Sequence, residues 1–310
     1  MFSERRTTCR FGETSTLERM GRRWAGGAVL VLTAALITGC SSSDDDPPNE
    51  GDEYVALGDS YTAATNTGPI EQPLDGCGRS ETNYPHQVAE ELDMKLTDVS
   101  CNGASTFDLA AAQTRNNQTM PPQLDALGKD TQLVTLSLGG NDYGFLGRIT
   151  GCALTYQDRY ADVSGTPCTD LDANAPNGTA TQLPKVEDNL VAAIDAVRER
   201  APEARILVVG YPQLFPAAGT CELAPIPPGD YPWARGIIED LNSEMSAAAK
   251  QKDVPYVDVA GPSEGHDICS DDPWIAGHVV TLGDASPYHP YPEEVEAVTD
   301  LVVAAVEQDD

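Results

Sequence analysis

Three short blocks of the sequence each place a reactive or hydrogen-bonding residue just after an apolar run. Ser60 follows "YVALGD", Gly103 follows "LTDVSCN", and Asn141 follows "LVTLSLGG". An acyl-transfer site needs a nucleophile, a base and donors aimed at a developing oxyanion. Ser60 would be the nucleophile, and the Ser60 and Gly103 backbone N–H groups with the Asn141 amide would be the donors. Taken alone, "GDS" is more typical of a helix cap.

The base must be one of four histidines. His289 stands in "SPYHPYPEE", between the last predicted strand and the last predicted helix, and we predict that it is the general base. His86 falls on a predicted helix and is interpreted as a surface residue. His266 and His278 lie in the loop around Cys269, and we interpret both as structural.

These blocks meet only if the apolar runs are neighbouring parallel strands, whose carboxyl ends share one edge of a sheet. Short apolar runs alternate with helical patterns, which predicts βαβ units and a mainly parallel sheet. Strands are predicted at 54–58, 96–100, 133–138, 205–210 and 255–259, and helices at 84–94, 106–113, 185–200, 234–251 and 292–308. Residues 146–184 show no clear period and are predicted to form a long loop.

The N-terminal residues 1–39 are predicted to be a leader and signal peptide, because basic residues precede an apolar stretch of about a dozen residues. The stretch ends in Ile-Thr-Gly-Cys, which resembles the lipobox of bacterial lipoproteins and makes Cys40 the predicted lipidation site. An ordinary signal peptide with a chance cysteine is the alternative, and translation could start at Met1 or Met20. Residues 40–52 are predicted to be an acidic flexible tether, and residues 53–310 one folded domain.

The formal net charge of the chain is −30. A strongly acidic surface repels nucleic-acid phosphates and anionic lipid headgroups. We therefore predict no nucleic-acid partner, and we interpret the charge as a solvated coat.

Cysteine usage points to an oxidising compartment. Six cysteines remain when Cys9 in the leader and Cys40 are set aside, and an even number in an exported domain predicts three disulfides, with 15 possible connectivities. A metal site is disfavoured because there is no CxxC pair and no histidine at ligand spacing from a cysteine. No motif for a nucleotide, flavin or other cofactor is present, so we predict none.

Four blocks occur in the order "GDSYTA" with Ser60, "NGAS" with Gly103, "GGND" with Asn141 and "HP" with His289. In this order they resemble the SGNH hydrolases, also called GDSL-type esterases and lipases. The resemblance spans about residues 54–306 and implies a three-layer α/β/α sandwich of flavodoxin-like type with about five mainly parallel strands. It implies that Ser60 is the nucleophile and an oxyanion donor, that Gly103 and Asn141 are the other donors, and that His289 is the base. The G-x-S-x-G turn of the α/β-hydrolases is absent.

The cysteines also fit the secreted actinobacterial branch of this family, in which neighbours in sequence pair. That resemblance implies the disulfides Cys77–Cys101, Cys152–Cys168 and Cys221–Cys269.

This sequence departs from the family pattern at the group that orients His289. Most members of the family carry Asp three residues before the base, and here that position is Ser286. The resemblance favours the backbone carbonyl of Ser286 as the orienting group. The alternatives are Asp284 and a loop carboxylate among Asp267, Asp271 and Asp272.

The resemblance and the residues together predict an extracytoplasmic, lipid-anchored serine esterase or lipase that hydrolyses carboxylic esters through an acyl-enzyme intermediate. It would act as a monomer on a small-molecule, lipid or glycan ester, at the outer face of the cell membrane or released from it. The alternative is a catalytically silent surface lipoprotein that binds an acylated or glycan ligand. The acyl length and the alcohol part are left open, and residues 65–80 and 146–184 are expected to shape the cleft.

Overall fold

The computed structural model describes residues 48–49, 51–72, 74–281 and 283–308. The predicted leader 1–39, the lipidation site Cys40 and most of the tether 40–52 lie outside the described residues. No helix within the described ranges is long and apolar enough to cross a membrane.

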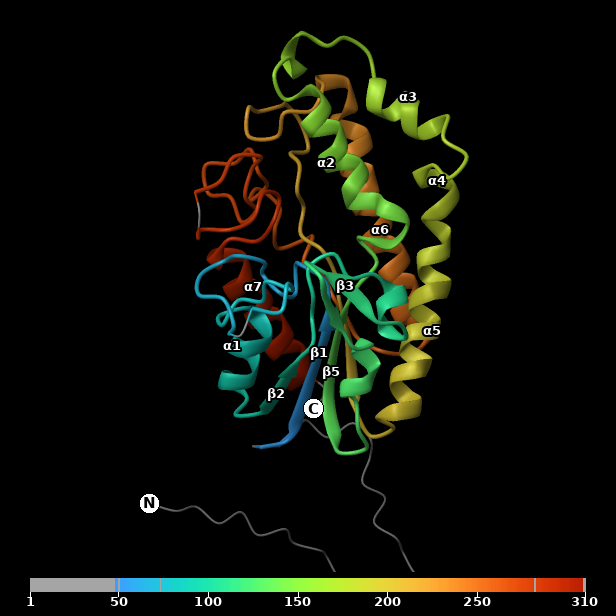
Figure 1. The fold of residues 1–310 in the computed structure, drawn as a ribbon, viewed down its shortest axis with the longest axis vertical. Helices are drawn as coiled ribbons and strands as arrows, with labels where there is room; N and C mark the ends of the chain where they lie inside the picture. Colours follow the sequence, from blue (N-terminus) through green and yellow to red (C-terminus); the bar gives the residue numbers. More distant parts are fainter. Residues whose placement is uncertain (1–47, 50, 73, 282, 309–310) are drawn as a thin grey trace, which may run out of the picture. The chain divides into compact units, whose positions relative to one another are not determined.

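Five parallel strands form the central sheet, in the order β2-β1-β5-β6-β7 (Figure 1). Their bounds are β1 Glu53–Gly58, β2 Lys95–Asp98, β5 Thr131–Ser137, β6 Arg205–Val209 and β7 Tyr256–Val257. All five lie where the sequence predicts strands. The strands that precede Ser60, Gly103 and Asn141 are β1, β2 and β5, and they are neighbours in the sheet.

Helices cover both faces of this sheet, as Figure 1 shows. On one face pack α1 Tyr84–Glu91 and α7 Pro292–Glu307, and on the other α5 Pro184–Arg200 and α6 Tyr231–Gln251. The prediction of a flavodoxin-like three-layer sandwich is confirmed. It arises because apolar residues recur along one side of each helix, for example Leu190, Ile194 and Val197 of α5, which are all buried.

Strand β1 shows why its sequence is an uninterrupted apolar run. Val55 and Leu57 belong to the core on the α5 and α6 side, whereas Tyr54 and Ala56 belong to the core beneath α1 and α7. Successive side chains of a strand point to opposite faces, so a strand with helices on both sides must be apolar at every position.

Two predictions about local structure are wrong. Residues 146–184 are not a loop, because they hold most of α2 Phe145–Tyr156, together with α3 Pro167–Ala173 and α4 Thr179–Gln182. The predicted helix 106–113 is one short 3₁₀ turn, Thr106–Leu109, followed by a hairpin of β3 Gln113–Arg115 and β4 Gln118–Met120. The other 3₁₀ turns within the described ranges are Gln123–Ala126, Asp142–Gly144, Tyr160–Asp162 and Pro228–Asp230.

The hairpin turns through Asn116 and Asn117, whose φ angles are +48° and +63°. Positive φ at both central residues is the requirement of a type I′ turn, and asparagine tolerates it better than most residues. This turn fixes the position of Arg115 at the end of β3.

Three disulfides staple the loops around the sheet: Cys77–Cys101, Cys152–Cys168 and Cys221–Cys269. This is the pairing that the family resemblance implied. The bonds join residues 24, 16 and 48 positions apart. By the chain-entropy argument, closing a loop of such length stabilises the fold by about 3–4 kcal/mol.

Candidate active site

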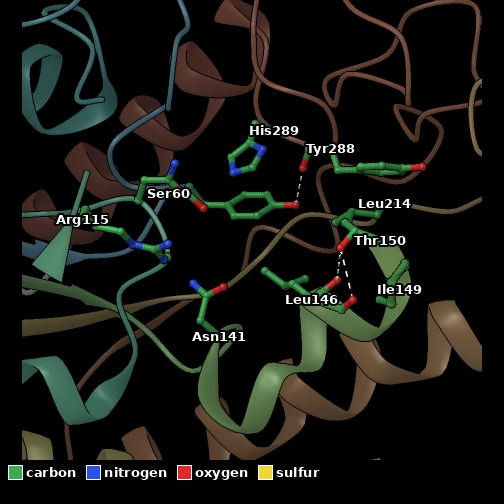
Figure 2. A pocket seen from close by; sticks show the side chains of 13 residues that line it. Ser60, Arg115, Asn141, Leu146, Ile149, Thr150, Leu214, Tyr288 and His289 are labelled. Carbon is green, nitrogen blue, oxygen red and sulfur yellow. Dashed lines mark hydrogen bonds between the residues drawn. The ribbon is translucent and has the colours of Figure 1, made fainter. Parts of the chain in front are cut away.

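Ser60, Gly103, Asn141 and His289 line one cavity at the carboxyl edge of the sheet (Figure 2). The cavity has a volume of about 200 Å³. Ser60 lies two residues beyond β1, Gly103 five beyond β2 and Asn141 four beyond β5. Because these strands are adjacent and parallel, three segments that are far apart in sequence end at the same place.

Two backbone N–H groups in this cavity are free. Among the hydrogen bonds of the described residues, none uses the N–H of Ser60 or of Gly103 as donor. Ser60 is only 3% exposed, and its hydroxyl also makes no hydrogen bond to the described residues. A free hydroxyl beside two unused N–H donors is the arrangement that an acyl-transfer site requires before a substrate binds.

A glycine is needed at position 103. Its φ is +71°, which L side chains rarely adopt, and a Cβ atom there would overlap the guanidinium of Arg115. The positive φ favours glycine here, and a side chain at this position would also displace the guanidinium of Arg115.

The amide of Asn141 is held by two acceptors. Its Nδ2 atom lies 2.9 Å from the carbonyl oxygen of Ala104 and 3.2 Å from Oδ2 of Asp59. A third acceptor, such as a substrate oxyanion, would compete with the longer of these contacts. The amide is thus fixed in position beside the cavity.

Asp59 is fully buried directly behind Ser60. Besides the Asn141 amide, its carboxyl group accepts hydrogen bonds from the Tyr211 hydroxyl at 2.8 Å and from the Tyr61 backbone N–H at 2.9 Å. Burial nevertheless raises the pKa of Asp59 to about 7, because the charged form is poorly solvated there. Through these hydrogen bonds, Asp59 connects the segment after β1 with Asn141 after β5 and Tyr211 after β6.

His289 donates from Nδ1 to the carbonyl oxygen of Pro287, with 2.7 Å between the two atoms. A carbonyl oxygen can only accept, so the ring proton is on Nδ1 and the lone pair is on Nε2. Partial burial lowers the pKa of His289, which favours the neutral ring. The ring stacks on Tyr61, with 5.5 Å between the centroids.

The orienting carbonyl belongs to Pro287 and not to Ser286, so that prediction is wrong by one residue. The Ser286 carbonyl instead accepts the backbone N–H of His289 at 3.1 Å. This hydrogen bond closes a four-residue turn from Ser286 to His289, in which Pro287 is the second residue and Tyr288 the third. The φ angle of Tyr288 is +63°. These are the features of a type II turn, in which the carbonyl of the second residue stays outside the closing hydrogen bond. The Pro287 carbonyl is therefore available to the ring.

The four carboxylates considered as alternatives are those of Asp284, Asp267, Asp271 and Asp272. Among the described residues, none of them forms a hydrogen bond or ion pair with His289. Asp267 accepts the backbone N–H of Cys269, and Asp272 lies beside His266.

The remaining histidines are away from the cavity. His266 stacks on Trp274, His278 contacts Gln157, and His86 contacts Asn83 in front of α1. Of the four histidines, only His289 lines the cavity.

One side of the cavity is apolar. Leu146 and Ile149 come from α2, and Leu214 and Tyr288 come from loops, as Figure 2 shows. Of the two segments expected to shape the cleft, 146–184 contributes its first residues, whereas no residue of 65–80 lines the cavity.

Potential metal ligands also lie away from this cavity. Within the described ranges, Glu71, His86 and Asp98 come close enough together to share an ion, but Glu71 is already paired with the guanidinium of Arg79. The other grouping contains the Cys152–Cys168 disulfide, whose sulfur atoms are already bonded to each other. Neither grouping includes a residue that lines the cavity.

Several residues of the site were not predicted from the sequence: Tyr61, Pro287, Tyr211, Arg115 and the buried carboxyl of Asp59. Asp59 and Tyr61 flank Ser60, so their place in the sequence gave a signal. Nothing in the sequence around Tyr211 connects it with the site. Arg115 depends on the Asn116-Asn117 turn, which is a recognisable hairpin signal.

A flavodoxin-like sandwich that carries serine, glycine, asparagine and histidine at the carboxyl edge of its sheet defines the SGNH class of hydrolases. Comparison with known proteins agrees, because residues 56–293 match the GDSL-like lipase/acylhydrolase family. The chain belongs to this family and is a carboxylic-ester hydrolase.

Several similar proteins come from Streptomyces. Lipase 2 of Streptomyces coelicolor is 38% identical over 77% of this chain and 80% of its own length, and a lipase of Streptomyces rimosus is 31% identical over 88% and 93%. The crystal structure of phospholipase A1 from Streptomyces albidoflavus NA297 is 30% identical, with a TM-score of 0.66, covering 82% of this chain and 98% of that one. An extracellular lipase from Streptomyces rimosus is 25% identical, with a TM-score of 0.68, covering 82% and 100%.

Proposed function

We propose that this protein is an extracytoplasmic serine esterase or lipase in which Ser60 is the nucleophile and His289 the general base. The observation that carries the proposal is the joint lining of one cavity by both side chains and by the unused N–H groups of Ser60 and Gly103. Since the ring proton of His289 is on Nδ1, its Nε2 lone pair is available for the hydroxyl proton.

The reaction proceeds in two halves. Ser60 Oγ attacks the ester carbonyl carbon while its proton passes to Nε2 of His289, and the resulting oxyanion accepts hydrogen bonds from the Ser60 and Gly103 N–H groups and from Asn141. The C–O bond to the alcohol then breaks, His289 returns the proton to the leaving oxygen, and the acyl group remains on Ser60. Water, deprotonated by His289, attacks the acyl-enzyme, and the carboxylic acid is released.

The Pro287 carbonyl takes the place of the usual aspartate. It fixes the tautomer and orientation of His289 as a carboxylate would, but it carries no full charge and stabilises the imidazolium less. The site therefore works as a dyad that a main-chain carbonyl supports.

A fluorophosphonate probe tests the assignment. Ser60→Ala is expected to abolish both labelling and hydrolysis of p-nitrophenyl butyrate, since the bond to the probe forms at Ser60 Oγ. Ser286→Ala is the matched control, because it removes a serine hydroxyl near His289 and leaves the backbone carbonyls in place. Labelling of the Ser60→Ala protein at the normal rate would contradict the proposal.

The lipid anchor and the location are a second part of the proposal. Three disulfides fit a protein that matures in an oxidising compartment. The anchor rests on Cys40 alone, which directly follows the predicted signal peptide. A fatty-acid analogue is expected to label the wild type but not the Cys40→Ser variant, and an unlabelled wild type would overturn the anchor.

A further inference from the structure

Arg115 differs from the other described arginines because its guanidinium has no partner. It forms no hydrogen bond, ion pair or ring contact with any described residue. Every other arginine within the described ranges has a carboxylate, carbonyl or aromatic partner: Arg79, Arg148, Arg159, Arg198, Arg200, Arg205 and Arg235. The chain has 49 acidic and 19 basic side chains, so carboxylates are plentiful, yet none of the described ones pairs with this guanidinium.

The structure holds this guanidinium next to the free N–H groups. Arg115 ends β3, and its guanidinium packs on the face of Gly103 that a Cβ atom would otherwise occupy. Figure 2 shows it beside Ser60, on the side of the cavity away from Leu214 and Ile149. Among the described residues, Arg115 is the only lysine or arginine that lines the cavity.

The cavity thus has two different ends, and Ser60 lies on the side of Arg115. Leu146, Ile149 and Leu214 form an apolar end that suits an acyl chain, and Arg115 forms a cationic end. An ester bound with its carbonyl at Ser60 and its acyl chain against the apolar end would direct its alcohol part toward Arg115. A fork of N–H donors fits the paired oxygens of a phosphate or carboxylate.

We propose that Arg115 binds the phosphodiester of a zwitterionic glycerophospholipid whose carboxylic ester lies at Ser60. The inference rests on the proposed esterase function and adds the class of its alcohol part. A zwitterionic headgroup fits better than a purely anionic one, because the chain carries a net charge of −30 and repels anions at long range. A neutral glycan or glycerol ester would leave the guanidinium without a counter-charge.

The competing role for a cation at this place is stabilisation of the oxyanion itself. The two roles differ in what they affect. Stabilising the oxyanion would raise kcat for every ester, whereas binding a headgroup would lower KM for phosphate-bearing esters alone.

The experiment compares two soluble substrates that share their acyl chains. Purified wild type, Arg115→Gln, Arg115→Lys and the control Arg198→Gln are assayed on dihexanoylglycerophosphocholine and on dihexanoylglycerol, below the concentrations at which these lipids aggregate. A third substrate, the dihexanoyl ester of glyceric acid, carries a carboxylate in place of the phosphodiester.

Arg115→Gln is expected to lower kcat/KM on the phosphocholine about 10- to 100-fold, mainly through KM, because it removes a charge-assisted pair of hydrogen bonds. The rate of Arg115→Gln on dihexanoylglycerol should stay within about 2-fold of the wild type. Arg115→Lys keeps the positive charge, so its KM for the phosphocholine should lie between those of the wild type and Arg115→Gln. Arg198→Gln should match the wild type on every substrate.

Four outcomes would overturn the inference. Equal losses on both lipids, carried by kcat, would assign Arg115 to the oxyanion. A larger loss on the glyceric acid ester would make this a carboxylate site, and no loss on the phosphocholine would show that the guanidinium binds no headgroup. A wild type that hydrolyses p-nitrophenyl butyrate but neither dihexanoyl lipid would also overturn the inference. A wild type inactive on p-nitrophenyl butyrate as well would instead contradict the esterase function on which the inference rests.

Discussion

The imidazole of His289 is oriented by the backbone carbonyl of Pro287, two residues before it, across 2.7 Å. This contact is built by a single turn, so the orienting group and the ring move together. Burial lowers the pKa of His289 and the carbonyl partly opposes that shift. The proposed base is therefore neutral when substrate arrives.

A first prediction is that no carboxylate supports His289. Changing Asp284, Asp267, Asp271 or Asp272 singly to Asn should leave kcat/KM on p-nitrophenyl butyrate within about 3-fold of the wild type, since none contacts the ring in the described structure. A triad aspartate, by comparison, contributes about 10⁴-fold. A loss of that size in one folded variant would show that the site is a triad.

The acid limb of the pH–rate profile should reflect His289. Because the pKa of His289 lies below its usual 6.5, kcat/KM should fall with decreasing pH only below about pH 6.5, as the ring gains a proton and ceases to be a base. Asp59, with a pKa of about 7, is the competing group. A limb near pH 7 that disappears in Asp59→Asn would assign the profile to Asp59 instead.

Asn141→Ala should slow turnover by about 10²–10³-fold, the usual loss for one oxyanion donor. The effect should fall on kcat, because the oxyanion exists only after attack by Ser60. Thermal melting serves as the control, since the Asn141 amide also binds Ala104 and Asp59. A folded variant with a near wild-type rate would show that Asn141 only holds the loop after β5.

Glu294 should make stability depend on pH. It is 4% exposed, its carboxyl group has no hydrogen-bond partner among the described residues, and burial raises its pKa from 4.5 to about 8. The folded state therefore keeps a proton that the unfolded state loses, and stability falls as pH rises from about 4.5 to 8.

Glu294→Gln should remove this penalty, which linkage places on the order of a few kcal/mol. The melting temperature of the variant relative to the wild type should rise between pH 5 and pH 9. The control is Glu293→Gln, one residue earlier and exposed, which should show no such trend. A constant difference between variant and wild type across the pH range would contradict the assignment.

Much of the fold could be predicted from the sequence because its repeat patterns are local. A strand covered by helices on both sides is apolar at every position, and a helix that packs on the sheet with one side is apolar along that side alone. Val295, Val298 and Val302 of α7 are an example of such a helix face. Helix α2 was missed because glycines at 147 and 151 and threonines interrupt its apolar period, and the turn residues that follow it suggested a loop.

The residues Ser60, Gly103, Asn141 and His289 could be chosen from sequence alone, because each stands in a short block at the end of a predicted strand or before the last helix. The strand order β2-β1-β5, which depends on long-range pairing, brings Ser60, Gly103 and Asn141 together. The segment before α7 adds His289 to the same cavity. The sequence therefore indicates which residues can form the site, and the pairing order of the strands places them next to one another.

Only the tertiary structure decided the details that govern the chemistry. Whether Ser286 or Pro287 orients His289 depends on which carbonyl closes the turn, and the positive φ of Tyr288 settles it. Whether Arg115 is paired depends on where the hairpin places it among segments far away in sequence. A local pattern records the preferences of neighbouring residues, whereas these contacts depend on backbone torsions and on packing between distant segments, and no short stretch of sequence contains that information.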